Sequence, residues 1–277
     1  MLHGTPASEG IGLGRVMIVE EAKLEYNNVT VTDTEAEVER FRNAVKIFCD
    51  NTAAQADALK ASAGKKEAEI LEGHIQMMKD PYMCGEIEKL IDNGQCAEAA
   101  LEYMCDMFIS MFSATDDELT QQRAADVKDL KTSMLSILLG VKEVKLSAAP
   151  KGTVVVAKEL TPSMTAGINK ENIVGIITET GGKTSHSAIL ARALEIPAVL
   201  SVNGAVSKLS AGAYVIVDGS EGVVIDEPDD AVIQEYDTKR INFLKERKEL
   251  ENFRGKATKA LSCLLYTSDA ADDSLRV

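Results

Sequence analysis

A histidine behind a pair of glycines is the residue of this chain best suited to chemistry. His186 follows Gly181-Gly182-Lys183-Thr184-Ser185, and an apolar helical pattern runs from Ala188 to Leu194. Pro197 ends the pattern, because proline cannot continue a helix and biases the preceding residue toward extended geometry. We therefore expect His186 at or beside a helix N-terminus, where backbone N–H groups and the positive end of the helix dipole bind phosphate well.

An imidazole beside a phosphate-binding nest indicates a nucleophile that itself becomes phosphorylated. The candidate phosphate ligands are Gly182, Lys183, Thr184 and Ser185. The alternative is structural, because Ser and Thr are ordinary N-caps and a histidine near a cap is often only solvated. The spacing by itself leaves both interpretations open.

The composition is that of a soluble globular protein with room for two modest domains. The chain has 277 residues, of which 45% are hydrophobic and 27% charged. It shows neither an apolar run of the ~20 residues that cross a bilayer nor a secretory signal, so we expect a cytoplasmic protein. Its 5 cysteines have no paired spacing, and with 3 histidines a metal cluster is not expected.

The net charge of −14 limits the class of partner. It opposes binding to nucleic acid, which requires Lys and Arg to neutralise phosphates, and it opposes docking on anionic membranes. It favours a basic protein partner. The alternative is that the acidity serves solubility only.

The first 140 residues change from a strand-like to a helical pattern. Residues 1–20 indicate a glycine-rich turn followed by a strand at Val16–Val19. From Thr32 to about Gly140 the period is helical, and Thr34 and Glu37 have the spacing of a capping box. After the first helix, further helices are expected at about 65–78, 84–93, 97–112 and 119–139. Helices joined by short connections indicate an antiparallel bundle.

From about Pro150 the pattern alternates between strands and short helices, which predicts a mixed α/β domain. Strands are expected at 154–156, 173–177, 198–200, 214–217 and 223–225, the last two as a hairpin, and helices at about 163–170 and 187–195. If the strand at 16–19 joins this sheet, the helical bundle is an insertion into the α/β domain.

The end of the chain contains a charged helix and then an unrelated segment. Residues 229–248 form an amphipathic pattern whose apolar face is Val232, Ile233, Tyr236, Ile241 and Leu244. After Ser262 the pattern no longer fits what precedes it, and we interpret residues 263–277 as a non-native tail. The predicted division is an α/β domain of residues 1–28 and 142–228, a helical domain of 29–141, and a connector helix within 229–262.

The chain resembles the N-terminal half of Enzyme I of the bacterial sugar phosphotransferase system, a phosphoenolpyruvate–protein phosphotransferase. The resemblance covers about residues 1–262 and includes residues 4–14, 160–166 and the His186 motif, which alone would fit any phosphoenolpyruvate-utilising enzyme. The segments at 72–80 (EGHIQMMKD) and 123–130 (RAADVKDL) lie in the helical region and are similar to Enzyme I specifically.

The resemblance implies a swivelling phosphohistidine domain in which His186 accepts a phosphoryl group from phosphoenolpyruvate and passes it to the carrier protein HPr. It also implies that the Thr165 hydroxyl contacts the active histidine, although Thr165 could instead only cap a helix. Lys183 matches an Arg/Lys position of the family. The family's histidine-pairing lysine aligns with Glu67, next to Lys66, which puts that contact on His186 in doubt.

The helical insertion is the HPr-docking surface that the resemblance implies, with His74, Met77, Met78 and Arg123 as candidate contacts. For the two methionines, ordinary bundle core is the alternative. In the family, phosphoenolpyruvate and Mg²⁺ bind a C-terminal barrel that also forms the dimer. For the present chain we therefore expect no cofactor and a monomer.

Two other functions compete with this interpretation. The first is the phosphohistidine domain of a dikinase or phosphoenolpyruvate synthase, in which His186 would serve a nucleotide site. The second is a non-enzymatic acidic helical module that binds partners and carries no covalent phosphate.

Overall fold

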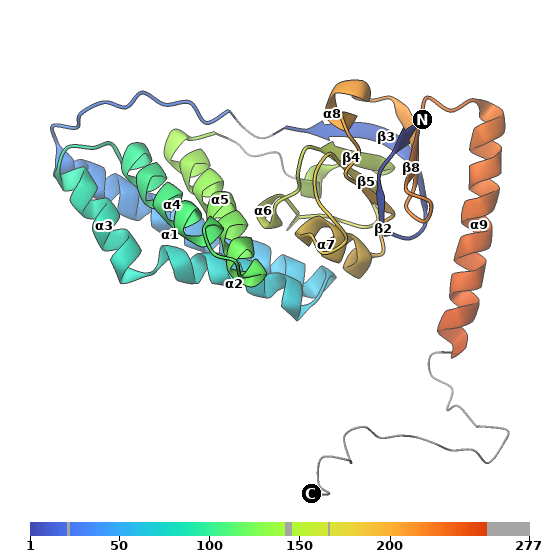
Figure 1. Cartoon of the computed structure of the whole chain (residues 1–277), viewed down its shortest axis with the longest axis horizontal. Helices are drawn as coiled ribbons and strands as arrows, with labels where there is room; N and C mark the ends of the chain where they lie inside the picture. Colours follow the sequence, from blue (N-terminus) through green and yellow to red (C-terminus); the bar gives the residue numbers. More distant parts are fainter. Residues whose placement is uncertain (21–22, 142–145, 166, 254–277) are drawn as a thin grey trace, which may run out of the picture.

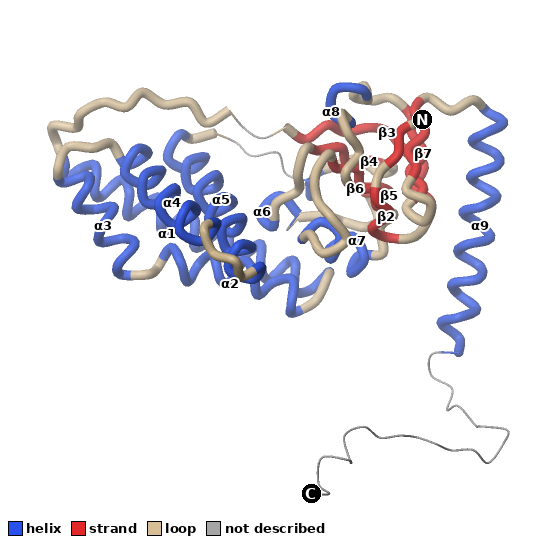
Figure 2. The backbone as a smooth tube through the Cα atoms, in the orientation of Figure 1, coloured by secondary structure: helices blue, strands red, loops and turns tan. Residues whose placement is uncertain are grey.

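The computed structural model describes residues 1–20, 23–141, 146–165 and 167–253. The first five helices gather in one unit, and the strands gather in another (Figures 1 and 2). The helical unit lies between the third and fourth strands in sequence, so the chain leaves the sheet and returns to it. The predicted insertion of a helical bundle into an α/β fold is confirmed.

The helical bundle consists of α1 (Thr34–Ser62), α2 (Lys65–Met78), α3 (Pro81–Asp92), α4 (Ala97–Ser113) and α5 (Glu118–Leu139). Their apolar faces meet in one buried cluster that includes Phe41, Phe48, Ile87, Leu101 and Leu130. The three- and four-residue spacing of these side chains is what aligns one apolar stripe per helix toward the common core.

The first helix starts one residue earlier than expected. Asp33, one residue earlier than the predicted cap, accepts a hydrogen bond from the Ala36 amide at 3.1 Å. Glu37 does not complete a capping box, because its carboxylate pairs with Arg40 at 2.7 Å and accepts from the Ala97 amide at 2.8 Å. The hydrogen bond from Arg40 holds the pKa of Glu37 below its ordinary value. The carboxylate therefore ties α1 to α4.

The third helix begins earlier than its apolar pattern indicated. Proline suits the first helical position, where its missing N–H is not needed, and Pro81 occupies that position. The Asp80 carboxylate accepts from the amides of Tyr82 and Met83. The segment that interrupted the predicted pattern is thus the start of α3.

The sheet has eight strands in the order β1-β8-β7-β3-β4-β5-β6-β2. The strands are β1 (Leu2–His3), β2 (Thr5–Ser8), β3 (Ile11–Val19), β4 (Thr153–Ala157), β5 (Ile173–Thr178), β6 (Ala198–Leu200), β7 (Tyr214–Asp218) and β8 (Val223–Asp226). β3 pairs in parallel with β4, and β7 forms the predicted hairpin with β8. Only Gly4 separates the two edge strands β1 and β2, so the edges of the sheet come together.

Gly10 lies in a bend between β2 and β3, but Gly12 and Gly14 do not form the turn that we expected. Gly12 and Gly14 lie inside β3. A Cβ atom at Gly12 would stand 2.0 Å from the Val174 carbonyl oxygen, and one at Gly14 would stand 2.2 Å from that of Gly152. These positions lack a side chain because another backbone approaches closely.

Three helices accompany the sheet: α6 (Pro162–Thr165), α7 (His186–Leu194) and α8 (Ala205–Lys208). The first of these was expected to continue to about residue 170. It ends at Thr165 because the chain turns there to place Ile168 in the core, with the Ile168 amide donating to the Thr165 carbonyl at 3.1 Å. α8 was not predicted, since four residues are too few to show a helical period.

The last helix, α9 (Asp230–Phe253), runs along the side of the sheet away from the bundle (Figure 1). Phe243 is partly buried and approaches Gly10. Ile241 and Leu244, which we expected on the packed face, are exposed. The prediction is wrong for those two because the helix turns Phe243 toward the sheet instead. The tail at 263–277 lies outside the described residues.

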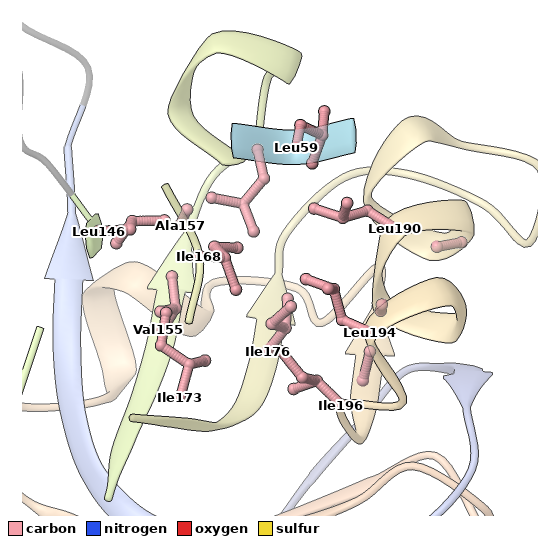
Figure 3. Packing of buried hydrophobic residues seen from close by; sticks show 14 of the residues in the cluster. Leu59, Leu146, Val155, Ala157, Ile168, Ile173, Ile176, Leu190, Leu194 and Ile196 are labelled. Carbon is pink, nitrogen blue, oxygen red and sulfur yellow. The ribbon is translucent and has the colours of Figure 1, made fainter. Parts of the chain in front are cut away.

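Residues of both units share one buried apolar cluster. Leu59 of α1 and Leu71 of α2 belong to the same cluster as Ile176 of β5 and Leu190 of α7. Figure 3 shows Leu59 next to the side chains of the α/β unit. Apolar burial at this contact holds the bundle beside the α6–α7 face of the sheet.

None of the helices in the described ranges has the length and apolarity that a membrane crossing requires. Cys49, Cys96 and Cys105 are buried, and Cys84 is half-buried. Burial raises the pKa of the Cys105 thiol to about 12. Cys263 lies outside the described residues.

Candidate phosphohistidine site

His186 is the first residue of α7, and Ser185 is the N-cap. The Ser185 hydroxyl accepts from the Ala188 amide at 3.3 Å. The paired glycine and polar residues therefore form a loop that ends in a helix start, as the sequence predicted. First-turn amides of a helix have no carbonyl partner within that helix, and such amides stabilise an anion placed at the helix start.

Thr165 lies next to the histidine. Its hydroxyl oxygen is 3.2 Å from His186 Nε2 and donates to the Pro162 carbonyl at 2.9 Å. Thr165 is 0% exposed, so α6 fixes the hydroxyl in place. A hydroxyl has one proton, and when that proton goes to Pro162, Oγ1 accepts from Nε2–H and orients the imidazole. The threonine thus both ends α6 and contacts the histidine.

Two side chains donate hydrogen bonds to backbone carbonyls of the glycine loop. Arg192 of α7 donates to the carbonyls of Ala7 and Lys183, at 3.1 and 3.0 Å. Ser201 donates to the Gly181 carbonyl at 2.6 Å. Arg192 therefore fixes the loop backbone.

The tip of the same loop faces solvent. Gly182, Lys183 and Thr184 are exposed, whereas His186 is half-buried. A partner can therefore reach the loop. The His186 ring is in contact with Thr165. Three of the expected phosphate ligands thus lie on an exposed loop that leads directly to the histidine.

The candidate partner contacts separate into buried and exposed groups. His74 is 2% exposed and Met78 is fully buried in the bundle core, so neither offers a surface in this arrangement. The docking role expected for these two needs correction, because the inward face of α2 carries them. Met77 is half-buried and Arg123 is exposed. The side chains of Lys66 and Glu67 lie outside the described part of the structure.

Met77 lines an apolar groove of about 520 Å³ on the bundle. The groove also contains Tyr82 of α3, Phe108 and Phe112 of α4, and Val127 of α5. Arg123 lies one turn before Val127 on α5 and so shares its face of the helix. Met77 and Arg123 are thus near one surface feature, which sequence reasoning could not outline because four helices form it.

Two residues without a predicted role connect the units. The carboxylate of Asp129 on α5 accepts hydrogen bonds from the amide and hydroxyl of Ser163 on α6. Both residues belong to segments that the resemblance identified, but their contact spans 34 residues of sequence. Among the described residues, no group of three or more His, Cys, Asp or Glu is arranged to hold a metal ion.

The phosphohistidine hypothesis predicts that substituting Thr165 with valine slows phosphoryl transfer at His186 by about tenfold, because misplaced reacting groups lose rate steeply. Valine keeps the shape of threonine but removes the hydroxyl that orients the ring. Thr165→Ser keeps the hydroxyl and is the matched control. The measurement is the single-turnover transfer of labelled phosphate from phospho-HPr to this chain. Equal rates for Thr165→Val and the unmodified chain would show that the hydroxyl does not orient the ring.

Comparison with known protein families matches two successive parts of the chain. The family model described as PEP-utilising enzyme, N-terminal, matches residues 3–123. The one described as PEP-utilising enzyme, mobile domain, matches residues 149–222 and includes His186. The two matches together contain α1–α4, the beginning of α5, and most of the sheet.

Curated relatives are similar over nearly the whole chain. Phosphoenolpyruvate-protein phosphotransferase of Listeria innocua is 38% identical over 258 residues, covering 93% of this chain and 45% of that protein. The proteins of the same name from Staphylococcus carnosus and Bacillus subtilis are 38% and 36% identical, covering 91% and 90% of this chain and 44% of each protein. The chain thus spans less than half the length of these relatives.

A solved structure matches as well. The NMR solution structure of Enzyme I (nEIt) superposes with a TM-score of 0.78 at 35% identity, covering 88% of this chain and 99% of that one. A second structure, the N-terminal domain of Enzyme 1 - Nitrogen, has a TM-score of 0.58 at 24% identity and shows the fold alone.

Proposed function

The chain belongs to the Enzyme I family of phosphoenolpyruvate–protein phosphotransferases, and we propose that it carries a phosphoryl group on His186 and exchanges it with the carrier protein HPr. The observation that carries this proposal is the position of His186 at the start of α7, 3.2 Å from the buried Thr165 hydroxyl and behind an exposed glycine loop. The names of the relatives favour this function over that of a dikinase.

In the proposed reaction, a neutral imidazole nitrogen of His186 attacks the phosphorus carried by the histidine of HPr. The new phosphorus–nitrogen bond forms as the old one breaks, and the electron pair returns to the HPr ring. A neutral imidazole nitrogen carries a lone pair, which makes it a competent nucleophile for this transfer. The developing charge on the phosphoryl oxygens would be stabilised by the first-turn amides of α7 and by Lys183 and Thr184.

The remaining steps of the whole enzyme belong to the part of the relatives that this chain does not match. We assign the binding of phosphoenolpyruvate and Mg²⁺ to that part. The described residues contain no cluster suited to a metal. The steps proposed for this chain use its own residues only, and we expect them to take place in the cytoplasm.

We place HPr docking on the bundle groove lined by Met77, Phe108 and Phe112, with Arg123 beside it. An apolar centre with charged surroundings is the usual composition of a protein–protein contact. The acidity of the chain, −14 overall, favours a basic partner surface. The bundle also contacts α6, so a carrier docked there would be close to the unit that holds His186.

The proposal predicts that labelled phospho-HPr labels this chain reversibly and at His186 without any nucleotide. Both proteins would carry the phosphate on an imidazole, so the equilibrium should lie within a few kcal/mol of balance. The experiment mixes the two proteins, quenches in base and maps the modified peptide. Label on His3 or His74 would reject the proposal. Absence of label would favour the non-enzymatic binding module.

The docking surface can be tested apart from the chemistry. Phe112→Ala should weaken HPr binding by about tenfold, because truncating a buried aromatic contact typically costs more than 1 kcal/mol. Met111→Ala is the matched control on the same helix, since Met111 is exposed and outside the groove. Calorimetry at rising salt should show weaker association. Equal losses for both variants would place docking elsewhere.

A further inference from the structure

One carboxylate makes two hydrogen bonds between the two units. Asp129 Oδ2 accepts from the Ser163 amide at 3.0 Å, and Asp129 Oδ1 accepts from the Ser163 hydroxyl at 2.6 Å. Ser163 Oγ also lies 3.0 Å from the Thr161 hydroxyl. Asp129 is 3% exposed, although aspartate is rarely buried unless it is paired. A buried carboxylate that uses both oxygens on one residue fixes that residue in position and orientation.

A buried histidine, His74, lies next to the Asp129 carboxylate. The ring nitrogens of His74 lie 3.9 Å from Asp129 Oδ2 and 3.9 Å from Asp126 Oδ1. His74 comes from α2 and both aspartates come from α5, so the group joins two helices of the bundle. Movement of Asp129 away from Ser163 would therefore change the surroundings of a buried histidine.

The contact is connected to the phosphohistidine site on one side and to the docking groove on the other. Ser163 is two residues before Thr165 on α6, and Thr165 contacts His186. His74 is one turn before Met77 on α2, and Met77 lines the groove. The contacts of Asp129 with Ser163 and His74 thus join the helix that carries Met77 to the helix that carries Thr165.

We propose that Asp129 is a positioning residue that clamps Ser163 and thereby holds His186 toward the helical bundle for transfer with a carrier docked there. The inference rests on the proposed function. The apolar contact of Leu59 and Leu71 with the α/β unit is non-directional, whereas the clamp fixes the register of α6. Release of the two hydrogen bonds would free α6, and with it the site, from the bundle.

The test compares Asp129→Asn, Ser163→Ala and the double variant with two controls. Asparagine keeps the size of aspartate but turns an N–H group toward a Ser163 donor. Ser163→Thr keeps both the amide and the hydroxyl donor, so its transfer rate should equal that of the unmodified chain. Asp126→Asn changes the other carboxylate near His74, which makes no contact with Ser163. The readouts are the transfer rate at saturating phospho-HPr, the Kd for HPr, and hydrogen exchange at the Ser163 amide.

We expect Asp129→Asn and Ser163→Ala each to slow transfer by about tenfold, with the double variant no slower than either and the Kd changed less than about twofold. The Ser163 amide should exchange faster in Asp129→Asn, and both controls should behave as the unmodified chain does. Normal transfer rates in both single variants would overturn the inference. So would a parallel loss of HPr affinity, which would indicate a docking or folding defect.

The two failures can be told apart. If the unmodified chain accepts no label, the proposed function fails, and a clamp that positions His186 for transfer fails with it. If the unmodified chain accepts label but the variants do so at the same rate, only the clamp fails. Hydrogen exchange at Ser163 that is already fast in the unmodified chain would also reject the clamp.

Discussion

His186→Ala should abolish phosphoryl acceptance and leave the affinity for HPr within about twofold of that of the unmodified chain. The reason is that chemistry and docking lie on different units. His186 begins α7 of the α/β unit, whereas the apolar groove is formed by α2 to α5. The measurements are single-turnover labelling from phospho-HPr and calorimetry with unphosphorylated HPr.

His3→Ala provides the matched control for this experiment. His3 is an exposed residue of the edge strand β1, and its loss should leave both labelling and affinity unchanged. A large loss of HPr binding in His186→Ala would show that the carrier docks on the α/β unit. Residual base-stable label in His186→Ala would show that another side chain accepts the phosphate.

The sequence predicted the local part of this site because its signals are local. The paired glycine, the Ser185 cap and Pro197 lie within 17 residues, and together they determine where α7 begins and ends. Some strands were equally readable, since β6 is Ala198–Leu200 as expected. By contrast, β1, β2 and the first half of β3 lie in the segment that was predicted as a turn. Gly12 and Gly14 were wrongly predicted to form a turn. Glycine is needed at these positions because the backbone at Val174 and Gly152, which is distant in sequence, approaches closely.

The sequence could not predict which face of a helix meets which neighbour. Met77 and Met78 are adjacent, and a rotation of about 100° per residue sends one to the groove and the other to the core. His74 was expected at the surface because nothing near it in sequence would orient it. The residues that accompany it, Asp126 and Asp129, are 52 and 55 positions away. Such pairs become visible only when the helices are packed.

Gly219→Ala should lower the free energy of unfolding by about 3 kcal/mol, because overpacking against fixed groups is strongly destabilising. A Cβ atom at Gly219 would lie 1.9 Å from the Ser8 carbonyl oxygen and 2.8 Å from the Ala198 amide nitrogen. Both are backbone atoms of paired strands, β2 and β6, so neither can turn aside as a flexible side chain would.

The strand that would be displaced also supports the phosphohistidine loop. The Ala7 carbonyl of β2 accepts from Arg192, and Arg192 in turn holds the Lys183 carbonyl. Gly219→Ala should therefore slow phosphoryl acceptance as well as weaken the fold. Gly182→Ala is the matched control for the unfolding measurement alone, because no atom lies within 4 Å of its added Cβ and its backbone is outside the left-handed region. It does not serve as a control for labelling, because Gly182 is a candidate phosphate ligand.

Urea unfolding followed by circular dichroism measures the first effect, and labelling at a temperature where the variant remains folded measures the second. Gly182→Ala should change stability by less than about 0.5 kcal/mol, as surface substitutions usually do. An unchanged unfolding midpoint for Gly219→Ala would mean that β2 can shift away from β6 at little cost. In that case, the link through Ala7 to Arg192 would not hold the loop.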